Sequence, residues 1–303
     1  MSTRNYFSAA ALDRAGHHRR DPEWLTDRLA HPGTRLVVMR SGEVALDPEK
    51  RLALLAASDQ TLDIAGEGLV FLGLDEQGDA VFAVDLDGDG IADVAAALPV
   101  DHAFVDLRGA ASFLPAADGH WAAYSSAMQT WHRRHRWCGA CGQATLPDWA
   151  GHIRRCTGCG AEHFPRTDPV IIVLVVAGEH CLLGRNVMWP ARMWSALAGF
   201  VEPGECLEDA VAREVKEETD VTVGEVRYHS SQPWPFPLSL MIGWHADAGP
   251  EPPAVTIDPS ELSDAVWMRR EELLESAADG AVMLPGPFSI ARQLIDAWLA
   301  EEV

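Results

Sequence analysis

The stretch GFVEPGECLEDAVAREVKEETDV, residues 199–221, joins a turn to the most clearly patterned helix of the chain. Pro203 and Gly204 favour a loop at its start. After this loop, apolar residues recur at helical spacing at Leu207, Ala210, Val211 and Val215. This spacing predicts a helix with one buried face.

The opposite face of the predicted helix concentrates negative charge. Glu214 lies three residues before Glu217 and four before Glu218, so the three carboxylates are neighbours on a helix. Like charges at this spacing repel each other by roughly 0.2–0.5 kcal/mol per pair on an exposed helix. A divalent cation such as Mg²⁺ would relieve this repulsion, because it takes oxygen ligands and bridges carboxylates to substrate phosphates. A solvated acidic face is the alternative that these residues alone leave open.

The same stretch resembles the Nudix box, G-x5-E-x7-R-E-U-x-E-E-x-G-U, in which U is a bulky aliphatic residue. Eight positions are in register, namely Gly199, Glu205, Arg213, Glu214, Val215, Glu217, Glu218 and Val221. Asp220 stands where the family has its second glycine. That position ends the helix and favours a left-handed backbone, which Asp tolerates better than most non-glycine residues. We therefore expect a modest backbone strain at Asp220 and no loss of a metal ligand.

Two C-x-x-C pairs precede the box, at Cys138 and Cys141 and at Cys156 and Cys159. Their spacing is typical of a zinc ribbon, in which four thiolates surround Zn²⁺ tetrahedrally. A shell of four thiolates leaves no position for water, so we expect a structural metal. Disulfides are the alternative in an oxidising compartment, whereas a redox dithiol would need only one pair.

The charge balance limits the classes of partner. The 303 residues include 45 Asp or Glu and 24 Lys or Arg, which gives a formal net charge of −21. Such a chain repels nucleic acid and anionic lipid at long range, so a phosphate-bearing substrate would need local cations. No apolar run approaches the ~18 residues of a membrane-spanning helix, and the AAAL patch near the N-terminus does not form a signal peptide. The sequence therefore predicts a cytoplasmic protein without a membrane partner.

Three domains are predicted, at residues 1–128, 129–168 and 169–303. The first is a mixed α/β domain, with strands at residues 36–39, 44–46, 69–72 and 80–84. The third contains a continuous β-branched run at residues 170–176, which predicts a buried central strand, and a hairpin partner at residues 181–183. Between them lies WHRRHRW, residues 131–137, the only dense cationic patch. It could meet an RNA or nucleotide phosphate, but we favour pairing with the protein's own carboxylates.

An acidic run in the first domain fits part of a calcium-binding loop, with Asp85, Asp87, Asp89, Gly90 and Asp93 in register. Ala96 stands where that loop needs its closing glutamate. The residues before the run also favour a strand over the helix that such a loop requires. We therefore expect an acidic turn between strands.

Residues 231–239, SQPWPFPLS, alternate three prolines with Trp234 and Phe236. Proline fixes the backbone and removes amide donors, so the segment is predicted to be a stiff loop and neither a central strand nor a helix. Two aromatic rings on such a loop would form a platform for a flat ligand ring. A proline-rich loop that caps the core is the alternative.

The ribbon, the box, SQPWPFPLS and the later LPGPFSIARQLI together resemble the NADH pyrophosphatase family of Nudix hydrolases, over most of residues 130–303. The resemblance implies an α/β (α+β) protein with a C-terminal Nudix α/β/α sandwich, a central zinc ribbon and an N-terminal Nudix-like α/β domain. It implies metal-dependent hydrolysis of the pyrophosphate bond of NADH or NAD⁺, giving nicotinamide mononucleotide and AMP, and also removal of NAD caps from RNA. The alternatives are a Nudix hydrolase for another substrate such as ADP-ribose, and a non-catalytic zinc-ribbon binding protein.

The resemblance also implies cofactors and site residues. Two or more Mg²⁺ or Mn²⁺ ions, one structural Zn²⁺ per chain and a homodimer are expected. The Mg²⁺ or Mn²⁺ ligands would be the carbonyl of Ala198 and the side chains of Glu214, Glu217, Glu218 and Glu261. Glu218 is the first choice for the group that orients or deprotonates water, Glu217 the second, and Glu214 completes the catalytic set. Gly199, Glu205 and Arg213 would be structural, with Glu205 and Arg213 pairing to hold the loop to the helix.

The dinucleotide pocket implied by the resemblance is lined by residues from several parts of the chain, namely Phe164, Phe200, Ser231, Gln232, Pro233, Trp234, Pro235, Phe236, Pro237, Leu238 and Ala291. At Phe164 the family commonly has Tyr. Ring stacking would survive this difference, whereas a contact through the hydroxyl would be lost.

Overall fold

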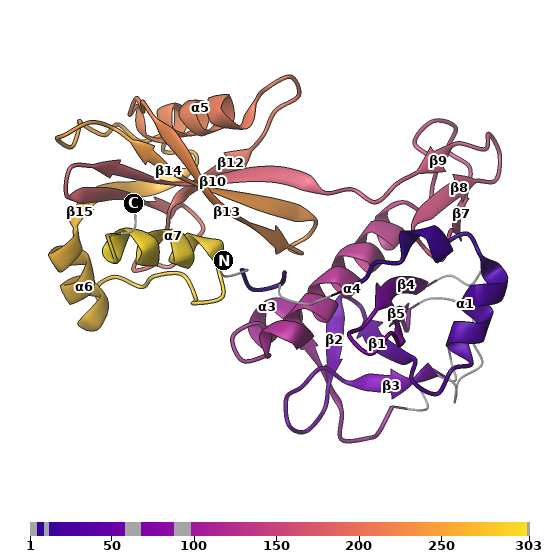
Figure 1. The fold of residues 1–303 in the computed structure, drawn as a ribbon. Coiled ribbons are helices and arrows are strands. Elements are labelled where there is room, and N and C mark those ends of the chain that lie inside the picture. The colour runs from indigo at the N-terminus through magenta and orange to yellow at the C-terminus, as the bar shows by residue number, and fades with distance from the viewer. Residues whose placement is uncertain (1–4, 9–11, 58–67, 88–97, 302–303) are drawn as a thin grey trace. The chain divides into compact units, whose positions relative to one another are not determined.

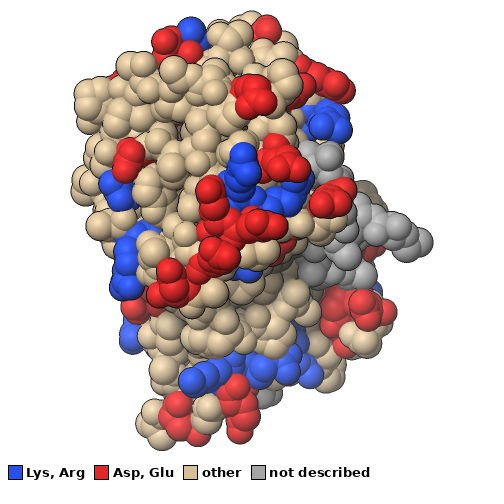
Figure 2. Space-filling model, turned by 90° about the vertical axis from the view of Figure 1, so that its left-hand side faces the viewer, with Lys and Arg blue, Asp and Glu red and all other residues tan. Residues whose placement is uncertain are grey.

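The computed structural model describes residues 5–8, 12–57, 68–87 and 98–301 (Figure 1). The chain forms two compact units. One contains Asp168–Pro233 and Ser239–Val303, and the other contains Tyr6–Thr167 and Trp234–Leu238. Within the described part of the chain, no helix is both long and apolar enough to cross a membrane. On the face drawn in Figure 2, acidic side chains form a band and basic side chains lie in small groups beside it.

The unit that contains Tyr6–Thr167 is built on a mixed sheet in the order β4-β5-β1-β2-β6, with β3 paired to β1. Its strands are β1 (Arg35–Arg40), β2 (Glu43–Leu46), β3 (Leu54–Ala56), β4 (Leu69–Leu74), β5 (Ala80–Asp85) and β6 (Ala103–Asp106). The four strands predicted from the sequence correspond to β1, β2, β4 and β5. Only β1 and β5 run parallel among the described pairs of this sheet. Its helical elements are η1 (Gly16–His18), α1 (Pro22–Leu29), α3 (Leu107–Ala110) and α4 (Ala116–Arg134).

Helix α4 packs against β1, β4 and β5. Its buried face includes Trp131, whose side chain is fully enclosed. The helix runs without interruption through residue 128, where the sequence suggests a domain boundary. The proposed boundary therefore falls inside one helix, and it stays a prediction.

The cationic run at the end of α4 is partly neutralised within the protein. Nη1 of Arg133 donates to Oδ2 of Asp85 at 2.5 Å, and Asp85 is only 3% exposed. For Arg133, pairing with an internal carboxylate is thus confirmed. Asp85 ends strand β5, as the acidic turn requires, whereas Asp89, Gly90, Asp93 and Ala96 lie outside the described residues.

The four cysteines lie around a small antiparallel sheet formed by β7 (Thr145–Asp148), β8 (Ile153–Cys156) and β9 (Glu162–His163). Within β8, Arg154 is almost completely buried. Its guanidinium donates to the hydroxyl and to the carbonyl of Thr145, at 2.8 and 2.7 Å. Buried donors are thereby satisfied in a subdomain too small for a large apolar core.

The second unit contains a mixed sheet in the order β13-β14-β10-β11-β15, with β12 paired to β10. Its strands are β10 (Asp168–Ala177), β11 (His180–Asn186), β12 (Leu197–Phe200), β13 (Val226–Trp234), β14 (Ser239–Asp247) and β15 (Leu262–Arg269). The predicted central strand and its hairpin partner are β10 and β11, which pair antiparallel. Helices α5 (Leu207–Thr219) and α7 (Ile290–Leu299) lie on opposite faces of the sheet, and α6 (Arg270–Ala278) follows β15 (Figure 1). This unit is therefore the expected α/β/α sandwich.

Strand β13 departs from a sequence expectation. It begins at Val226 and continues through Trp234. The prediction of a loop is therefore wrong for residues 231–234, and only residues 235–238 form a turn. Strand β13 lies at the edge of the sheet. An edge strand tolerates proline, because the missing N–H of Pro233 does not remove a hydrogen bond from the centre of the sheet.

Candidate active site

Helix α5 carries the acidic site and is fixed by its apolar face. Ala210, Val211 and Val215 are fully buried, and the helix packs on β10 and β12. Asp220 follows the helix with φ 59° and ψ 10°, the left-handed conformation expected there. The N–H of Asp220 donates to the carbonyl of Lys216 at 2.9 Å, so the helix closes without the family's glycine.

Arg213 links the loop before α5 to the acidic face of the helix. Its Nε and Nη2 donate to the two carboxylate oxygens of Glu205, at 2.6 and 2.9 Å, in a bidentate pair. Its Nη1 contacts Oε1 of Glu214 at 2.9 Å and Oε2 of Glu217 at 2.8 Å. Its Nη2 also donates to the carbonyl of Phe200 at 2.9 Å. The guanidinium holds the pKa of Glu205 down at about 2, so this loop carboxylate stays ionised.

Gly199 in β12 leaves room for one of the helix carboxylates. A Cβ placed on this residue would lie 1.9 Å from Cδ of Glu214. The space that a side chain would fill is therefore occupied by the Glu214 carboxylate, which is 9% exposed. Burial raises the pKa of Glu214 above its ordinary value, while Arg213 opposes this rise. The first glycine of the box is thus required by packing.

Glu218 is the most strongly perturbed carboxyl group of the helix. It is 6% exposed, and its Oε2 has no hydrogen-bond partner among the described residues. Burial raises the pKa of Glu218 to about 8, and the negative charges of Glu214, Glu261 and Asp258 add to the rise. A buried carboxylate without a donor is costly unless a proton or a cation neutralises it.

The loop before β15 brings acidic side chains to the C-terminal end of α5. The N–H of Asp258 donates to the carbonyl of Glu218 at 3.1 Å, and that of Thr256 donates to the carbonyl of Thr219 at 2.9 Å. Asp258 in turn accepts the N–H and hydroxyl of Ser260 at 2.8 and 2.7 Å. The structure thereby places Glu261 close enough to Glu218 to raise its pKa. Asp258 is an acidic neighbour that the sequence interpretation missed.

The carboxylates offer the oxygen donors that Mg²⁺ and Mn²⁺ prefer, but they are not drawn into a tight cluster. Among the described residues, the four cysteines are the only group of three or more His, Cys, Asp or Glu side chains whose ligand atoms all lie within 4.8 Å of one another. Glu217 is directed to Arg213 and its side chain is 60% exposed. Mg²⁺ retains several waters and is usually bound through one or two carboxylates, so the partnerless Oε2 of Glu218 beside Glu214 and Glu261 fits such an ion. Ala198 is an exposed residue of β12, paired with Ile172.

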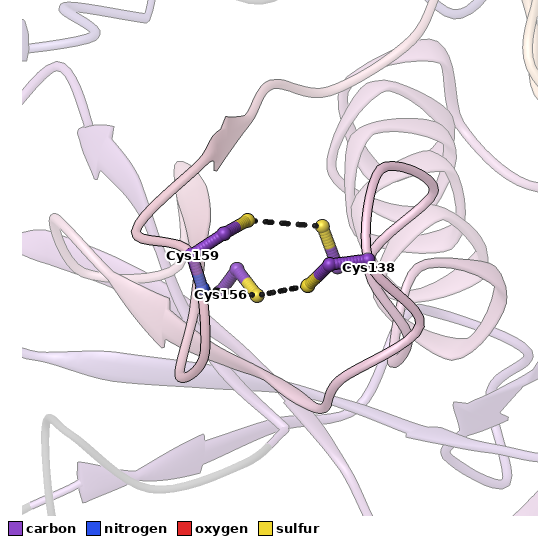
Figure 3. Close-up of side chains that lie close together, drawn as sticks. Cys138, Cys156 and Cys159 are labelled. Atoms are coloured by element: carbon purple, nitrogen blue, oxygen red, sulfur yellow. Dashed lines mark hydrogen bonds between the residues drawn. The ribbon is translucent and has the colours of Figure 1, made fainter.

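The four cysteines form a second and separate cluster. Figure 3 shows Cys156, the last residue of β8, and Cys159, just after it, facing Cys138 from another segment. The Sγ atoms of Cys138 and Cys159 lie 3.8 Å apart, and those of Cys141 and Cys156 lie 3.3 Å apart (Figure 3). Tetrahedral Zn–S bonds of about 2.3 Å put sulfurs about 3.8 Å apart. The N–H groups of Cys159 and Gly158 donate to Sγ of Cys156, each at 3.4 Å, and lower its pKa to about 6. This donor set fits a zinc ion.

Part of the expected dinucleotide pocket is held by hydrogen bonds. Gln232 is fully buried, and its side chain donates to the carbonyl of Phe288 and accepts the N–H of Ile290, each at 2.7 Å. These bonds join β13 to the first turn of α7, where Ala291 is also buried. Phe200, at the end of β12, exposes 61% of its surface. An exposed ring next to the acidic helix is available for stacking.

The aromatic residues of the proline-rich turn belong to the other unit. Trp234 and Phe236 meet edge to face, with ring centroids 5.1 Å apart, and Phe7 packs edge-on against both. The guanidinium of Arg108 lies 4.5 Å from the centroid of the Phe236 ring. Phe164 also belongs to this unit and is 58% exposed. Phe7 and Arg108 carry no local sequence signal for this role, because their contacts to Phe236 join residues more than a hundred positions apart.

Comparison with known families agrees with this arrangement. Residues 165–285 match the NUDIX domain, which defines the class as a Nudix hydrolase. Residues 33–131 match the NADH pyrophosphatase-like rudimentary NUDIX domain, and residues 133–164 match the NADH pyrophosphatase zinc ribbon domain.

Relatives match over nearly the whole chain. An NAD-capped RNA hydrolase NudC from Mycobacterium bovis is 38% identical, over 97% of this chain and 95% of the relative. NAD-capped RNA hydrolase NUDT12 from Homo sapiens is 33% identical, over 97% of this chain and 73% of the relative. Nudix hydrolase 19, chloroplastic, from Arabidopsis thaliana is 34% identical, over 88% and 74%. The chain therefore belongs to the NADH pyrophosphatase family of Nudix hydrolases.

Proposed function

We propose that this protein hydrolyses the pyrophosphate bond of NADH and NAD⁺, giving nicotinamide mononucleotide and AMP, and that it removes NAD caps from RNA by cutting the same bond. Relatives that are 33–38% identical over 97% of this chain are named NAD-capped RNA hydrolases. The structural observation that carries the proposal is the buried Oε2 of Glu218, which has no partner among the described residues and lies in an acidic neighbourhood.

We assign the divalent ions to Glu214, Glu218 and Glu261, with Glu217 and the carbonyl of Ala198 as further ligands. At these residues Mg²⁺ or Mn²⁺ would supply positive charge to the pyrophosphate and would lower the pKa of an attacking water. Glu218 is the group that orients this water or takes its proton. Its buried position supports this role, because a carboxylate that lacks protein donors keeps its lone pairs available.

Arg213, another residue of the Nudix box, links the parts of the proposed site. Arg213 binds Glu205, Glu214 and Glu217 and the carbonyl of Phe200, so the loop, β12 and α5 are held together by one guanidinium. The aromatic ring of Phe200 is assigned to stacking, as are those of Phe164, Trp234 and Phe236. We also assign substrate contacts to Ser231, Gln232, Pro233, Pro235, Pro237, Leu238 and Ala291.

The test is release of AMP from NADH by the purified protein at saturating Mg²⁺ or Mn²⁺. Glu218→Gln removes the proposed base and a charged ligand while keeping the side-chain size, so we expect kcat to fall by about 10²-fold or more. Glu208→Gln is the matched control, because Glu208 is an exposed residue of the first turn of the same helix. Near-normal turnover by Glu218→Gln would show that the assignment is wrong.

A substrate panel separates the finer choices. NADH, NAD⁺, NAD-capped RNA and ADP-ribose share a pyrophosphate and differ in the groups that stack or extend from it. We expect ADP-ribose to be the poorest substrate, because it lacks the nicotinamide ring. Comparable hydrolysis rates for ADP-ribose and NADH would contradict the proposal that the aromatic residues stack on the nicotinamide ring. A homodimer and a cytoplasmic location are further proposals, which light scattering and cell fractionation test.

A further inference from the structure

The turn that follows β11 carries apolar residues where a turn normally carries polar ones. Asn186 closes it twice, because its carbonyl accepts the N–H of Trp189 at 3.0 Å and its Oδ1 accepts the N–H of Met188 at 2.9 Å. The central positions of such a turn favour Pro, Gly, Asp and Asn. Here they are Val187 and Met188, followed by Trp189, with 44%, 85% and 40% of their surfaces exposed. Neither core packing nor turn formation requires these three side chains, which we name the apolar turn.

The apolar turn begins at the edge of the proposed metal site, within the same compact unit. The N–H of Val187 donates to the carbonyl of Glu261 at 3.0 Å, directly after the pairing of Asn186 with Leu262 in antiparallel β11 and β15. Residues opposite each other in such a ladder carry their side chains on the same face, with Cβ atoms about 4.5–5.5 Å apart. The side chain of Val187 therefore lies beside that of Glu261, which in turn neighbours Glu218.

The backbone around the apolar turn is tied by further hydrogen bonds. Nη1 of Arg185 donates to the carbonyl of Ala191 at 2.6 Å, and the N–H of Met193 donates to the carbonyl of Pro190 at 2.9 Å. Side chains that are presented by an ordered backbone lose less conformational freedom when a ligand binds. The apolar turn is therefore prepared for contact before any ligand arrives.

The chemistry of the apolar turn selects an uncharged flat group. Residues 187–189 include no charged side chain, whereas a thioether and an indole pack well against the faces of rings. A chain with a net charge of −21 is repelled by the phosphates of RNA, but stacking of a base on an aromatic side chain does not depend on the charge of the backbone. Met188 is too exposed to line a closed pocket, so it suits a part of the substrate that extends away from the cleaved bond.

We propose that Met188 and Trp189 bind the base of the nucleotide that follows the cap in NAD-capped RNA. The inference rests on the proposed function and deepens it, because it names residues that distinguish a capped RNA from free NADH, which has no such base. Val187 anchors the turn beside Glu261, so the base is bound while the pyrophosphate lies at the acidic helix.

The experiment compares hydrolysis of NADH, of an NAD-capped hexaribonucleotide and of the same RNA without a base on its second nucleotide. Trp189→Ala should lower kcat/KM for the intact capped RNA, relative to that for NADH, by about tenfold. The unaltered protein should cleave the abasic RNA about tenfold less efficiently than the intact RNA, and Trp189→Ala should remove this difference. Trp189→Phe keeps a ring and should restore most of the preference for the intact RNA.

Trp137→Ala is the matched control, because Trp137 is an exposed tryptophan of the other compact unit. It should leave the ratio of the two efficiencies as it is in the unaltered protein. An equal change of this ratio in Trp137→Ala and Trp189→Ala would show only a general effect of exposed indoles and would overturn the assignment.

Other results would also overturn it. An unchanged ratio in Trp189→Ala, whether both activities fall together or neither falls, would leave the turn at most a role in positioning Glu261. A loss that is equal for intact and abasic RNA would exclude a contact with the base. A loss that accompanies a halved mass in light scattering would assign the turn to an interface between two copies of the chain. Absence of NADH cleavage by the unaltered protein would contradict the proposed function itself, so the two failures can be told apart.

Discussion

The four-cysteine cluster and the acidic face of α5 are both suited to cations, but the protein prepares them differently. The cysteine sulfurs already lie within 4.8 Å of one another, and backbone N–H groups favour the thiolate of Cys156. In α5, Nη1 of Arg213 is bound to both Glu214 and Glu217, and burial raises the pKa of Glu218 to about 8. The four sulfurs of the zinc site are therefore already in place without the ion. The carboxylates of the proposed catalytic site, in contrast, need bound cations to become fully ionised.

The contrast predicts that the ribbon depends on its metal for folding and the helix depends on its metal for activity. Thiolate sites contribute folding free energy outright, because small metal-bound subdomains lack a sufficient apolar core. Helix α5 instead is fixed by Ala210, Val211 and Val215 against the sheet. Loss of the divalent ions should therefore leave the Nudix domain folded.

The largest effect is expected for Cys156→Ser. Loss of one thiolate from a four-thiolate shell should reduce bound zinc from about one ion per chain to almost none, as measured by mass spectrometry of purified protein. Proteolysis should then cut within the ribbon. Cys206→Ser is the control, since Cys206 is exposed and outside the cluster. Full zinc content in Cys156→Ser would contradict the assignment.

Gly199→Ala should impair the acidic site without touching a charge. Because its Cβ would lie 1.9 Å from Cδ of Glu214, the carboxylate must move. A displacement of about 1 Å costs on the order of 10²-fold in turnover, which steady-state hydrolysis of NADH would report. In Gly224→Ala the new Cβ meets nothing closer than the carbonyl oxygen of Asp247 at 3.7 Å, so this variant should keep its activity. Equal activity of both variants would show that Glu214 need not stay in place.

The raised pKa of Glu218 predicts a dependence of magnesium affinity on pH. In the metal-free protein its folded-state pKa of about 8 exceeds the ordinary 4.5, so the folded state binds more protons. The free energy of unfolding should therefore fall as pH rises from about 5 to 8, and Mg²⁺ must displace this proton. Apparent affinity should rise by up to about tenfold per pH unit below pH 8 and level off above it. Thermal melts with and without Mg²⁺ test this, and Glu218→Gln should remove the slope.

The smallest effect is expected for Asp220→Gly. The residue has φ 59°, where glycine is free of the Cβ penalty, so urea unfolding should show a gain of less than about 1 kcal/mol. The gain is limited because glycine also loses the contact of the Asp220 carboxylate with Lys216. Asp220→Asn keeps the backbone preference and removes this contact, so the two variants separate the contributions. A large loss of activity in Asp220→Gly would instead give Asp220 a direct role.

Local spacing was enough to predict the elements that carry both cation sites. The helical periodicity gave α5, the C-x-x-C pairs gave the ribbon, and the β-branched run gave the central strand β10. Each of these three predictions uses residues that are close in sequence, and regular secondary structure fixes how such residues are arranged in space.

Features that depend on distant parts of the chain were not predictable. Asp258 joins the acidic neighbourhood only because its loop hydrogen-bonds to the end of α5. Arg108 and Phe7 meet the ring of Phe236 from more than a hundred residues away. Three prolines favoured a loop at residues 231–239, but the edge position of β13 allowed residues 231–234 to stay extended.

The division of the chain has a practical consequence for anyone who wishes to study its parts alone. Residues 234–238 pack with Tyr6–Thr167, although they are synthesised in the middle of the Nudix domain. A fragment that stops at residue 167 would lack Trp234 and Phe236, and Phe7 and Arg108 would lose their aromatic partners. A single cut therefore leaves neither compact unit with all of its residues.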